Sequence, residues 1–197
     1  GENEQICACL VMRSADMKDA EFLANHYVVF ATKQGVVKKT TLEAYSRPRA
    51  NGINAINVRE DDALLDVQLT DGNKHILLAS SAGKAIRFHE DDIRDMGRTA
   101  TGVRGMNLDN DEDAAAETRN VIVGMVCVDG ETVETAEGEE NPNAVTILAV
   151  SENGMGKRTD LDEYRIQSRG GKGLKTINVT EKKGNLIALK AITNNDD

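Results

Sequence analysis

The feature that most constrains the fold is a sequence pattern that occurs three times along the chain, at 27–58, 75–108 and 145–179. Each copy begins with an apolar stretch that is typical of a β-strand, namely VVFAT, ILLAS or TILAV. A turn follows and ends on a glycine, which suits the positive φ of a tight hairpin. These glycines are Gly35, Gly83 and Gly154. Each copy therefore predicts a β-hairpin at its start.

Two more strands are predicted in each copy. A short one reads INAINV, VRGMNL or LKTINV, and a longer one covers 63–69, 121–128 or 186–192. The segment ICACLVM, residues 6–12, resembles the longer strand and is predicted to end a preceding, absent repeat. Four short strands per unit are typical of a propeller-like array, so we expect an all-β fold of four-stranded repeats. Only residues 15–23 show weak helical character, as a short helix or a loop.

We expect one array over 1–197 rather than separate domains. The repeats are assigned to 27–69, 75–128 and 145–192, with an acidic insertion at 129–144. Because the chain starts with Gly-Glu-Asn rather than Met, we interpret it as a piece of a longer protein. No apolar run approaches the length of a membrane span and nothing resembles a signal peptide, so a cytoplasmic location is expected.

The charges of the chain are unevenly placed. A formal net charge of −9 and an aromatic content of 3% would by themselves argue against a nucleic-acid partner. Residues 129–141, however, hold six carboxylates and no base, whereas the bases lie on the repeats. The fourth residue of each predicted second strand is basic, at Lys39, Arg87 and Arg158. The position of the charges is therefore more informative than their sum.

Equivalent bases in every repeat predict a track for a phosphate backbone. If the repeats are related by rotation, these side chains recur along one rim, where they would contact phosphates without reading bases. The alternative is that Lys and Arg on exposed strands serve solubility and edge protection. The candidate DNA-binding residues are Lys38, Lys39, Arg47, Arg49, Lys84, Arg87, Arg98, Arg104, Lys157, Arg158, Arg169, Lys172 and Lys175.

No catalytic constellation is visible, and neither G-x-S-x-G nor H-E-x-x-H occurs. We therefore predict no catalytic residue, no metal site and no cofactor in this chain. Tyr45 and Tyr164 occupy matching positions in two repeats, which predicts a packing role. The cysteines match no metal or redox spacing and are expected to be small buried residues: Cys7, Cys9 and Cys127. The histidines are expected to be surface or turn residues: His26, His75 and His89.

Several motifs resemble the repeats of one known family. ATKQGVVKKT, NGINAI, GKAIRF, MGRTATGVRGMNL, ENGMGKRT and EYRIQSRGGKG are similar to the C-terminal domain of the DNA gyrase A subunit, over about Ile6 to Ile192. The resemblance implies a β-pinwheel, a disc of about six blades that exchange strands, of which this chain would hold about three. It also implies that duplex DNA bends around the basic rim. The related domain in the A subunit of topoisomerase IV is the alternative, although the MGR-x-A-x-GVRG pattern favours gyrase.

The resemblance further implies a place in a larger enzyme. The partners would be double-stranded DNA, the rest of the gyrase A subunit and the gyrase B subunit, with no membrane. ATP and Mg would belong to other parts of that enzyme, a type II topoisomerase that introduces negative supercoils. The family's signature heptad is close to QRRGGKG, and a box-like copy with serine in place of one arginine is formed by Gln167, Ser168, Arg169, Gly170, Gly171, Lys172 and Gly173.

Another class of function stays open from the sequence. A propeller-type scaffold could bind other proteins through its loops or its acidic insertions. Such a scaffold would be indifferent to DNA and to the loss of the strand bases. An enzyme in its own right has no support in the sequence.

Overall fold

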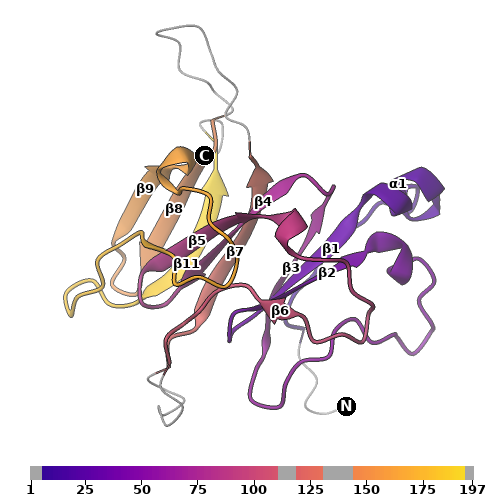
Figure 1. Cartoon of the computed structure of the whole chain (residues 1–197), viewed down its shortest axis with the longest axis horizontal. Helices are drawn as coiled ribbons and strands as arrows, with labels where there is room; N and C mark the ends of the chain where they lie inside the picture. Colours follow the sequence, from indigo (N-terminus) through magenta and orange to yellow (C-terminus); the bar gives the residue numbers. More distant parts are fainter. Residues whose placement is uncertain (1–5, 111–118, 131–143, 194–197) are drawn as a thin grey trace, which may run out of the picture.

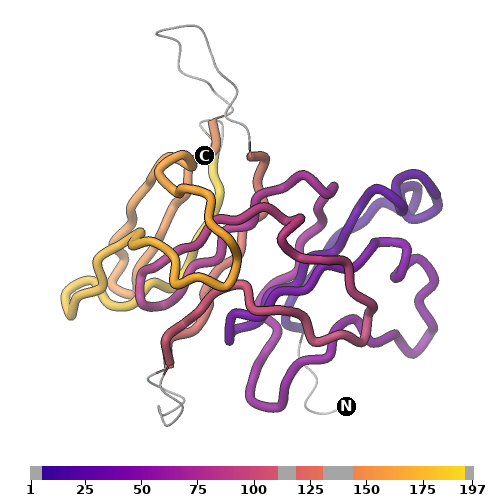
Figure 2. Tube along the Cα trace, in the orientation of Figure 1, coloured from indigo at the N-terminus to yellow at the C-terminus, as the bar shows by residue number. Residues whose placement is uncertain are grey.

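The computed structural model describes residues 6–110, 119–130 and 144–193, which form three antiparallel sheets side by side (Figures 1 and 2). Each repeat supplies three long strands to one sheet. These are β1 (Tyr27–Thr32), β2 (Val36–Thr41) and β3 (Leu64–Thr70); β4 (Lys74–Ser80), β5 (Lys84–His89) and β7 (Ile122–Asp129); and β8 (Thr146–Ser151), β9 (Gly156–Asp160) and β11 (Leu186–Ile192). The predicted all-β fold is confirmed.

The predicted hairpins are formed in all three repeats. Their turns close on Gly35, Gly83 and Gly154, with φ of 82°, 76° and 75°. This left-handed region is open to glycine at little steric cost and disfavoured for side chains with a Cβ. Glycine therefore occupies the position of each turn where a positive φ is required, as the sequence pattern predicted.

The short strands do not stay with their own repeat. β6 (Val103–Arg104), from the second repeat, pairs with β2 of the first, and β10 (Leu174–Lys175), from the third, pairs with β5 of the second. The sheet orders are thus β3-β1-β2-β6, β10-β5-β4-β7 and β11-β8-β9. The second and third repeats each complete the sheet of the repeat before them, which confirms the strand exchange that the family resemblance implied.

Two predicted strands are absent from the described part of the chain. The segment 53–58 is irregular, because no earlier repeat in this structure offers a second strand for it to pair with. The segment 6–12 also forms no strand, and since the described residues include no earlier repeat, its assignment as the last strand of a preceding repeat stays a prediction. Of this segment, Leu10 and Met12 pack against the hydrophobic cluster of the first sheet. Cys7 and Cys9 are consequently exposed rather than buried.

The weak helical signal near the N-terminus marks a 3-10 turn, η1 (Asp16–Lys18), and one short helix, α1 (Ala20–Asn25). Asp19 caps α1, since its carboxylate accepts hydrogen bonds from the backbone N–H of Glu21 and Phe22. Leu23 is buried from α1 against Leu42 of the first repeat. This N-terminal segment therefore covers the face of the first sheet that looks away from the second.

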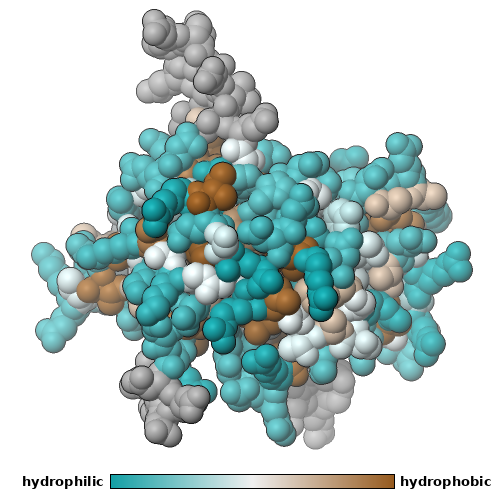
Figure 3. Space-filling view, viewed as in Figure 1, coloured by the Kyte–Doolittle hydropathy of each residue, from teal (hydrophilic) through white to brown (hydrophobic). Residues whose placement is uncertain are grey.

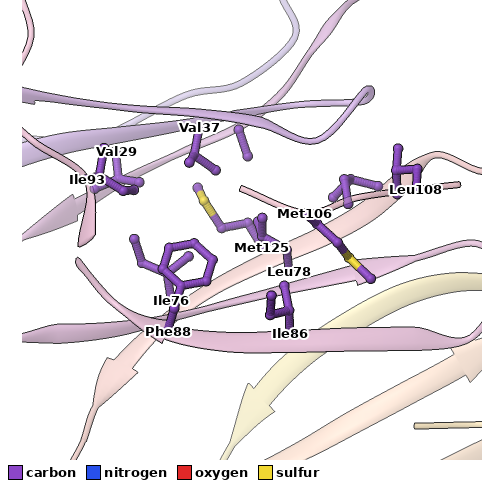
Figure 4. Packing of buried hydrophobic residues seen from close by; sticks show 12 residues of the cluster. Val29, Val37, Ile76, Leu78, Ile86, Phe88, Ile93, Met106, Leu108 and Met125 are labelled. Atoms are coloured by element: carbon purple, nitrogen blue, oxygen red, sulfur yellow. The ribbon is translucent and has the colours of Figure 1, made fainter. Parts of the chain in front are cut away.

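The core lies between the sheets rather than within one of them. Alternate residues of β1 and β4 face each other, so that Val29, Ile76 and Leu78 meet between the first two repeats (Figure 4). Leu77 and Ile147 meet in the same way between the second and third. Burying each such side chain contributes about 1.5–3 kcal/mol, and no repeat can bury both of its faces alone.

The sheets have distinct inner and outer edges. β7 contacts both β3 and β11, so the fourth strands gather on the inner side of the array. The opposite edge of each sheet ends in β6, β10 or β9. We call these three strands the outer edge.

Replacing Gly83 should destabilise the fold more than replacing Gly154. Both have positive φ, but an added Cβ at Gly83 would lie 2.4 Å from the carbonyl oxygen of Ile177 in the exchanged segment, whereas Gly154 has nothing within 4 Å. Gly154→Ala should cost about 1 kcal/mol in the free energy of unfolding, and Gly83→Ala about 1–3 kcal/mol more. Urea denaturation of both variants measures the difference. Equal costs would show that the exchanged segment does not press on the turn.

Candidate nucleic-acid interface

Two of the three equivalent strand bases are not on the surface. Lys39 and Arg87 are each 4% exposed, so their prediction as rim residues was wrong. The Lys39 ammonium donates a hydrogen bond to the Glu90 carbonyl at 3.2 Å and lies 3.7 and 3.6 Å from the carboxylates of Asp91 and Asp95. All three partners belong to the second repeat. Lys39 therefore joins the first repeat to the second.

Arg87 makes the equivalent connection from the second repeat to the third. Its Nη1 donates to the Leu161 carbonyl at 3.0 Å, and its Nη2 donates to the Gly130 carbonyl at 3.1 Å. Leu161 and Glu90 each begin a 3-10 turn, η5 (Leu161–Glu163) and η3 (Glu90–Asp92). The base of one repeat thus binds the first carbonyl of the turn in the next. We call this contact the interlock.

His75 belongs to the second interlock, although the sequence suggested a surface or turn residue. It is 8% exposed, and its Nδ1 accepts a hydrogen bond from Arg87 Nε at 3.0 Å. Burial and the nearby charge of Arg87 lower the pKa of His75. The neutral ring therefore acts as an acceptor that completes the bonding of the buried guanidinium.

Arg158 holds the same strand position in the third repeat but is exposed. Its Nε donates to Thr146 Oγ1 at 2.6 Å within its own sheet. The described residues include no repeat after the third, so no turn covers this side chain. The burial of Lys39 and Arg87 could have been inferred from the two-residue period of a strand, because they share a sheet face with the core residues Val37 and Ala85.

Lys38 is also buried, at 0% exposure. Its ammonium donates to the carbonyls of Ala55 and Arg98, both at 2.6 Å, and lies 5.2 Å from the centre of the Phe30 ring. Burial, helped by the positive charge of Arg98, lowers the pKa of Lys38 to about 8. Lys38 is therefore another link between the first two repeats rather than a rim residue.

The outer edge carries a different set of cations. Arg104 on β6 and Lys175 on β10 occupy equivalent positions and are exposed, and Lys157 and Arg158 are exposed on β9. Lys84, half-buried on β5, pairs directly opposite Lys175. The outer-edge cations are thus Lys84, Arg104, Lys157, Arg158 and Lys175. Arg104 and Lys175 stand on the exchanged strands β6 and β10, whereas Lys157 and Arg158 stand on β9, which pairs with β8 of its own repeat. Lys157 and Lys175 line one hollow.

One basic residue of this region was missed in the sequence. Lys183 lines a hollow of about 480 Å³ at the outer edge, together with Lys157 and Lys175. It lies outside the repeated motif, so no equivalent position pointed to it. Figure 3 shows hydrophilic residues over most of the face in view, with hydrophobic ones scattered among them. Such a surface on this face is typical of polar recognition rather than of an apolar docking patch.

The box-like loop 167–173 is fastened to the second repeat. Arg169 donates from Nε to the Asp92 carbonyl at 2.7 Å and from Nη1 to the Arg104 carbonyl at 3.0 Å. The backbone N–H of Gly170 donates to Gly105 at 2.6 Å. Exposed Lys172 forms an ion pair with Asp109 at 2.7 Å. The loop therefore holds the backbone of Arg104 in place. Arg169 and Lys172, which were predicted to bind DNA, here contact other parts of the protein.

The remaining candidate cations lie near the N-terminal helix. Arg47 and Arg49 are exposed on the loop after η2 (Leu42–Tyr45), and Arg98 is half-buried beside them.

Tyr164 is 4% exposed in the core, and the Tyr45 hydroxyl donates to the Ala55 carbonyl, so the predicted packing role of both tyrosines is confirmed.

The structure adds little on metals and membranes. Among residues 6–110, 119–130 and 144–193 no group of three or more His, Cys, Asp or Glu side chains is placed to hold a metal ion. In the same ranges no helix is both long and apolar enough to cross a bilayer. Most of the acidic insertion at 129–144 lies outside the described residues, apart from its first two residues and its last.

Comparison with known proteins decides the family. Residues 26–71, 74–116 and 146–193 match the family described as "DNA gyrase C-terminal domain, beta-propeller", and these ranges make up more than half of the chain. The chain belongs to this family. The gyrase resemblance and the pinwheel fold expected from the sequence are thereby confirmed.

The relatives of this gyrase C-terminal domain are gyrase A subunits. The chain is 39% identical over 196 residues to the DNA gyrase A subunit of Staphylococcus epidermidis and equally identical to that of Staphylococcus aureus strain MRSA252. In both cases the match covers 100% of this chain and 19% of the relative. The domain therefore spans about a fifth of the length of these curated relatives.

Solved structures show the same fold. A DNA gyrase A C-terminal domain superposes with a TM-score of 0.67 at 23% identity, covering 86% of this chain and 50% of that one. The C-terminal domain of E. coli ParC gives a TM-score of 0.58 at 17% identity, covering 86% and 63%. At this level of identity the agreement concerns the arrangement of the sheets.

Removing the interlock should destabilise the gyrase C-terminal domain. Arg87→Ala removes the side-chain donor to the carbonyls of Leu161 and Gly130 and to buried His75 Nδ1, although Leu161 keeps the backbone N–H of Tyr164. We therefore expect a loss of about 3 kcal/mol or more in the free energy of unfolding. Arg158→Ala, at the equivalent exposed position, should change it by less than about 0.5 kcal/mol. Urea denaturation followed by circular dichroism measures both. Similar costs would contradict a role for Arg87 in joining repeats.

Lys38 should give the domain a stability that rises at alkaline pH. The folded state releases the Lys38 proton near pH 8 and the unfolded state near 10.5. Between these values the unfolded state binds more protons, so the free energy of unfolding rises with pH. The free energy of unfolding of the wild type minus that of Lys38→Met should therefore increase from pH 8 to 10.5, as measured by urea denaturation across this range. A difference that stays constant over this range would contradict the lowered pKa.

Proposed function

We propose that this gyrase C-terminal domain binds duplex DNA along its outer edge and wraps it, without catalysis of its own. The observation that carries the proposal is the recurrence of exposed cations on the exchanged strands. Arg104 and Lys175 hold equivalent positions on β6 and β10, and Lys157 and Arg158 add two exposed cations on β9, the edge strand of the third sheet. This concentration of cations occurs in a chain whose net charge is −9.

The physical reason is the geometry of the array. Cations that recur at equivalent positions of successive repeats can contact successive stretches of one phosphate backbone. They contact phosphates rather than base edges, so we expect binding with little sequence preference and strong dependence on salt. Smoothly bending a few tens of base pairs costs on the order of 1–6 kcal/mol. Several phosphate contacts per repeat can offset that cost.

The parent enzyme supplies the remaining functions. The curated relatives are A subunits of DNA gyrase, and the domain spans only a fifth of their length. We propose that it acts with the rest of the gyrase A subunit and with the gyrase B subunit in the cytoplasm of a bacterium. In that arrangement ATP and Mg bind to other parts of the enzyme, and the wrapped DNA supports ATP-dependent negative supercoiling.

Neutralising two outer-edge cations tests the proposal. Arg104→Gln with Lys175→Gln should weaken binding to a duplex of about 40 base pairs by at least about ten-fold at low salt and lower the slope of log K against log salt by about 1.8, at about 0.9 per phosphate. Fluorescence anisotropy across a salt series measures both. Resonance energy transfer between the duplex ends reports wrapping.

The matched control is Arg13→Gln with Lys190→Gln, because one is exposed in the N-terminal segment and the other on the inner strand β11. It removes the same charge and should leave the salt slope unchanged. If both double variants lowered affinity equally, the outer edge would have no special role. If the wild type bound no duplex at low salt, the proposal would fail, and a protein-interaction scaffold would become the better explanation.

A further inference from the structure

A groove separates the N-terminal helix from the first repeat. It has a volume of about 800 Å³ and lies between α1 and the loop that follows η2. Its floor includes apolar side chains such as Leu23, which is 8% exposed and packed against Leu42. The walls are thus anchored in the core of the first repeat, and a groove of this size can accept a ligand with several functional groups.

The charged lining of this groove is strongly positive. Four cations face it against a single carboxylate, that of Glu43. The cations are Lys18, Arg47, Arg49 and Arg98. Across the ranges that the structure describes, none of the four side chains forms an ion pair within 4 Å or a hydrogen bond. Converging, unneutralised cations in a concave site focus a positive potential toward any bound group.

Arg98 differs in this respect from its equivalent in the next repeat. Arg169 occupies the same position and commits its guanidinium to the carbonyls of Asp92 and Arg104, at 2.7 and 3.0 Å. These hydrogen bonds hold the Arg169 side chain of the third repeat against the second repeat. The Arg98 side chain forms no such bonds among the described residues, and only its carbonyl is engaged, by Lys38 at 2.6 Å. The Arg98 guanidinium thus lines the groove without a protein partner among the described residues.

We propose that this groove is a phosphate-binding site separate from the outer edge. Phosphate fits better than a carboxylate, because three arginine forks and one ammonium exceed what one carboxylate can satisfy and match the oxygens of phosphate groups. The phosphates belong either to a nucleic-acid backbone that leaves the outer edge or to a free phosphate ester. The first source rests on the proposed function, and the second does not.

The connection to the outer edge favours the nucleic-acid source. Arg98 and Arg104 lie on one short segment of the second repeat, with Arg98 lining the groove and Arg104 exposed on β6. A backbone that follows the outer edge past Arg104 would reach the groove without crossing another repeat. Lys18 on η1 and the arginines of the first repeat then hold it from the other side.

Lys38 provides an internal reporter for occupancy. The charge of Arg98 contributes to the lowered pKa of Lys38, after burial itself. A phosphate group bound beside Arg98 would offset that charge and move the pKa of Lys38 upward. Titration of the Lys38 ammonium by NMR therefore detects an anion in the groove without relying on DNA.

The decisive experiment compares two triple variants. Lys18→Gln, Arg47→Gln and Arg49→Gln remove three charges from the groove. The control, Arg94→Gln, Arg165→Gln and Lys190→Gln, removes three exposed charges that do not line it. Each is titrated with a duplex of about 40 base pairs and with pyrophosphate, and urea denaturation checks that both fold.

We expect the groove variant to bind duplex about ten-fold more weakly than the control, with a salt slope lower by up to about 2.7 at 0.9 per phosphate. That result supports the site with nucleic acid as its ligand. If duplex binding is equal in the two variants but pyrophosphate raises the Lys38 pKa only in wild type and control, a free phosphate ester is the ligand.

If neither ligand distinguishes the groove variant from the control, the inference is overturned. The proposed function is judged separately, because it depends on the outer-edge double variant. If the outer-edge double variant loses duplex binding and the groove variant behaves like its control, the proposed function stands and the groove proposal fails. If the wild-type domain binds pyrophosphate in the groove but binds no duplex, the groove proposal stands and the proposed function fails.

Discussion

A single basic side chain per repeat holds this array together by donating to the carbonyl that opens the next repeat's 3-10 turn. Lys39 does so through Glu90 and Arg87 through Leu161. A buried cation is stable only if its donors are satisfied, and here the neighbouring repeat satisfies them. The first repeat is thus stabilised by the second, and the second by the third. Strand exchange and the apolar interfaces reinforce the same order of assembly.

Much of the fold could be predicted because each strand follows a local rule. The apolar stretches, the glycines of the hairpin turns and the spacing of the repeats identify every long strand. The failures concern segments whose structure depends on a neighbour. Residues 6–12 and 53–58 have strand-like sequences, yet they form no strand because nothing in the described chain pairs with them. Pairing partners are a tertiary property that composition does not reveal.

The candidate site was predictable only in part, for a related reason. Recurrence at one offset correctly marked Lys39, Arg87 and Arg158 as equivalent, but equivalence does not say whether a position faces solvent. The side of the strand on which a residue lies does say so: Lys39 lies on the same side as the core residue Val37, and Arg87 on the same side as Ala85. Arg104 and Lys175 were among the candidate residues and are exposed. Their place at the outer edge follows from the strand exchange rather than from their own repeats.

Strand exchange also determines how the domain would carry mechanical load. β6 bears Arg104 at the outer edge, is hydrogen-bonded to β2 of the first repeat and is covalently continuous with the second. A pull on Arg104 is therefore resisted by two repeats at once, by shear along one ladder and by tension in one chain. β10 distributes force between the second and third repeats in the same way. A force applied at β6 or at β10 is therefore shared by two neighbouring repeats.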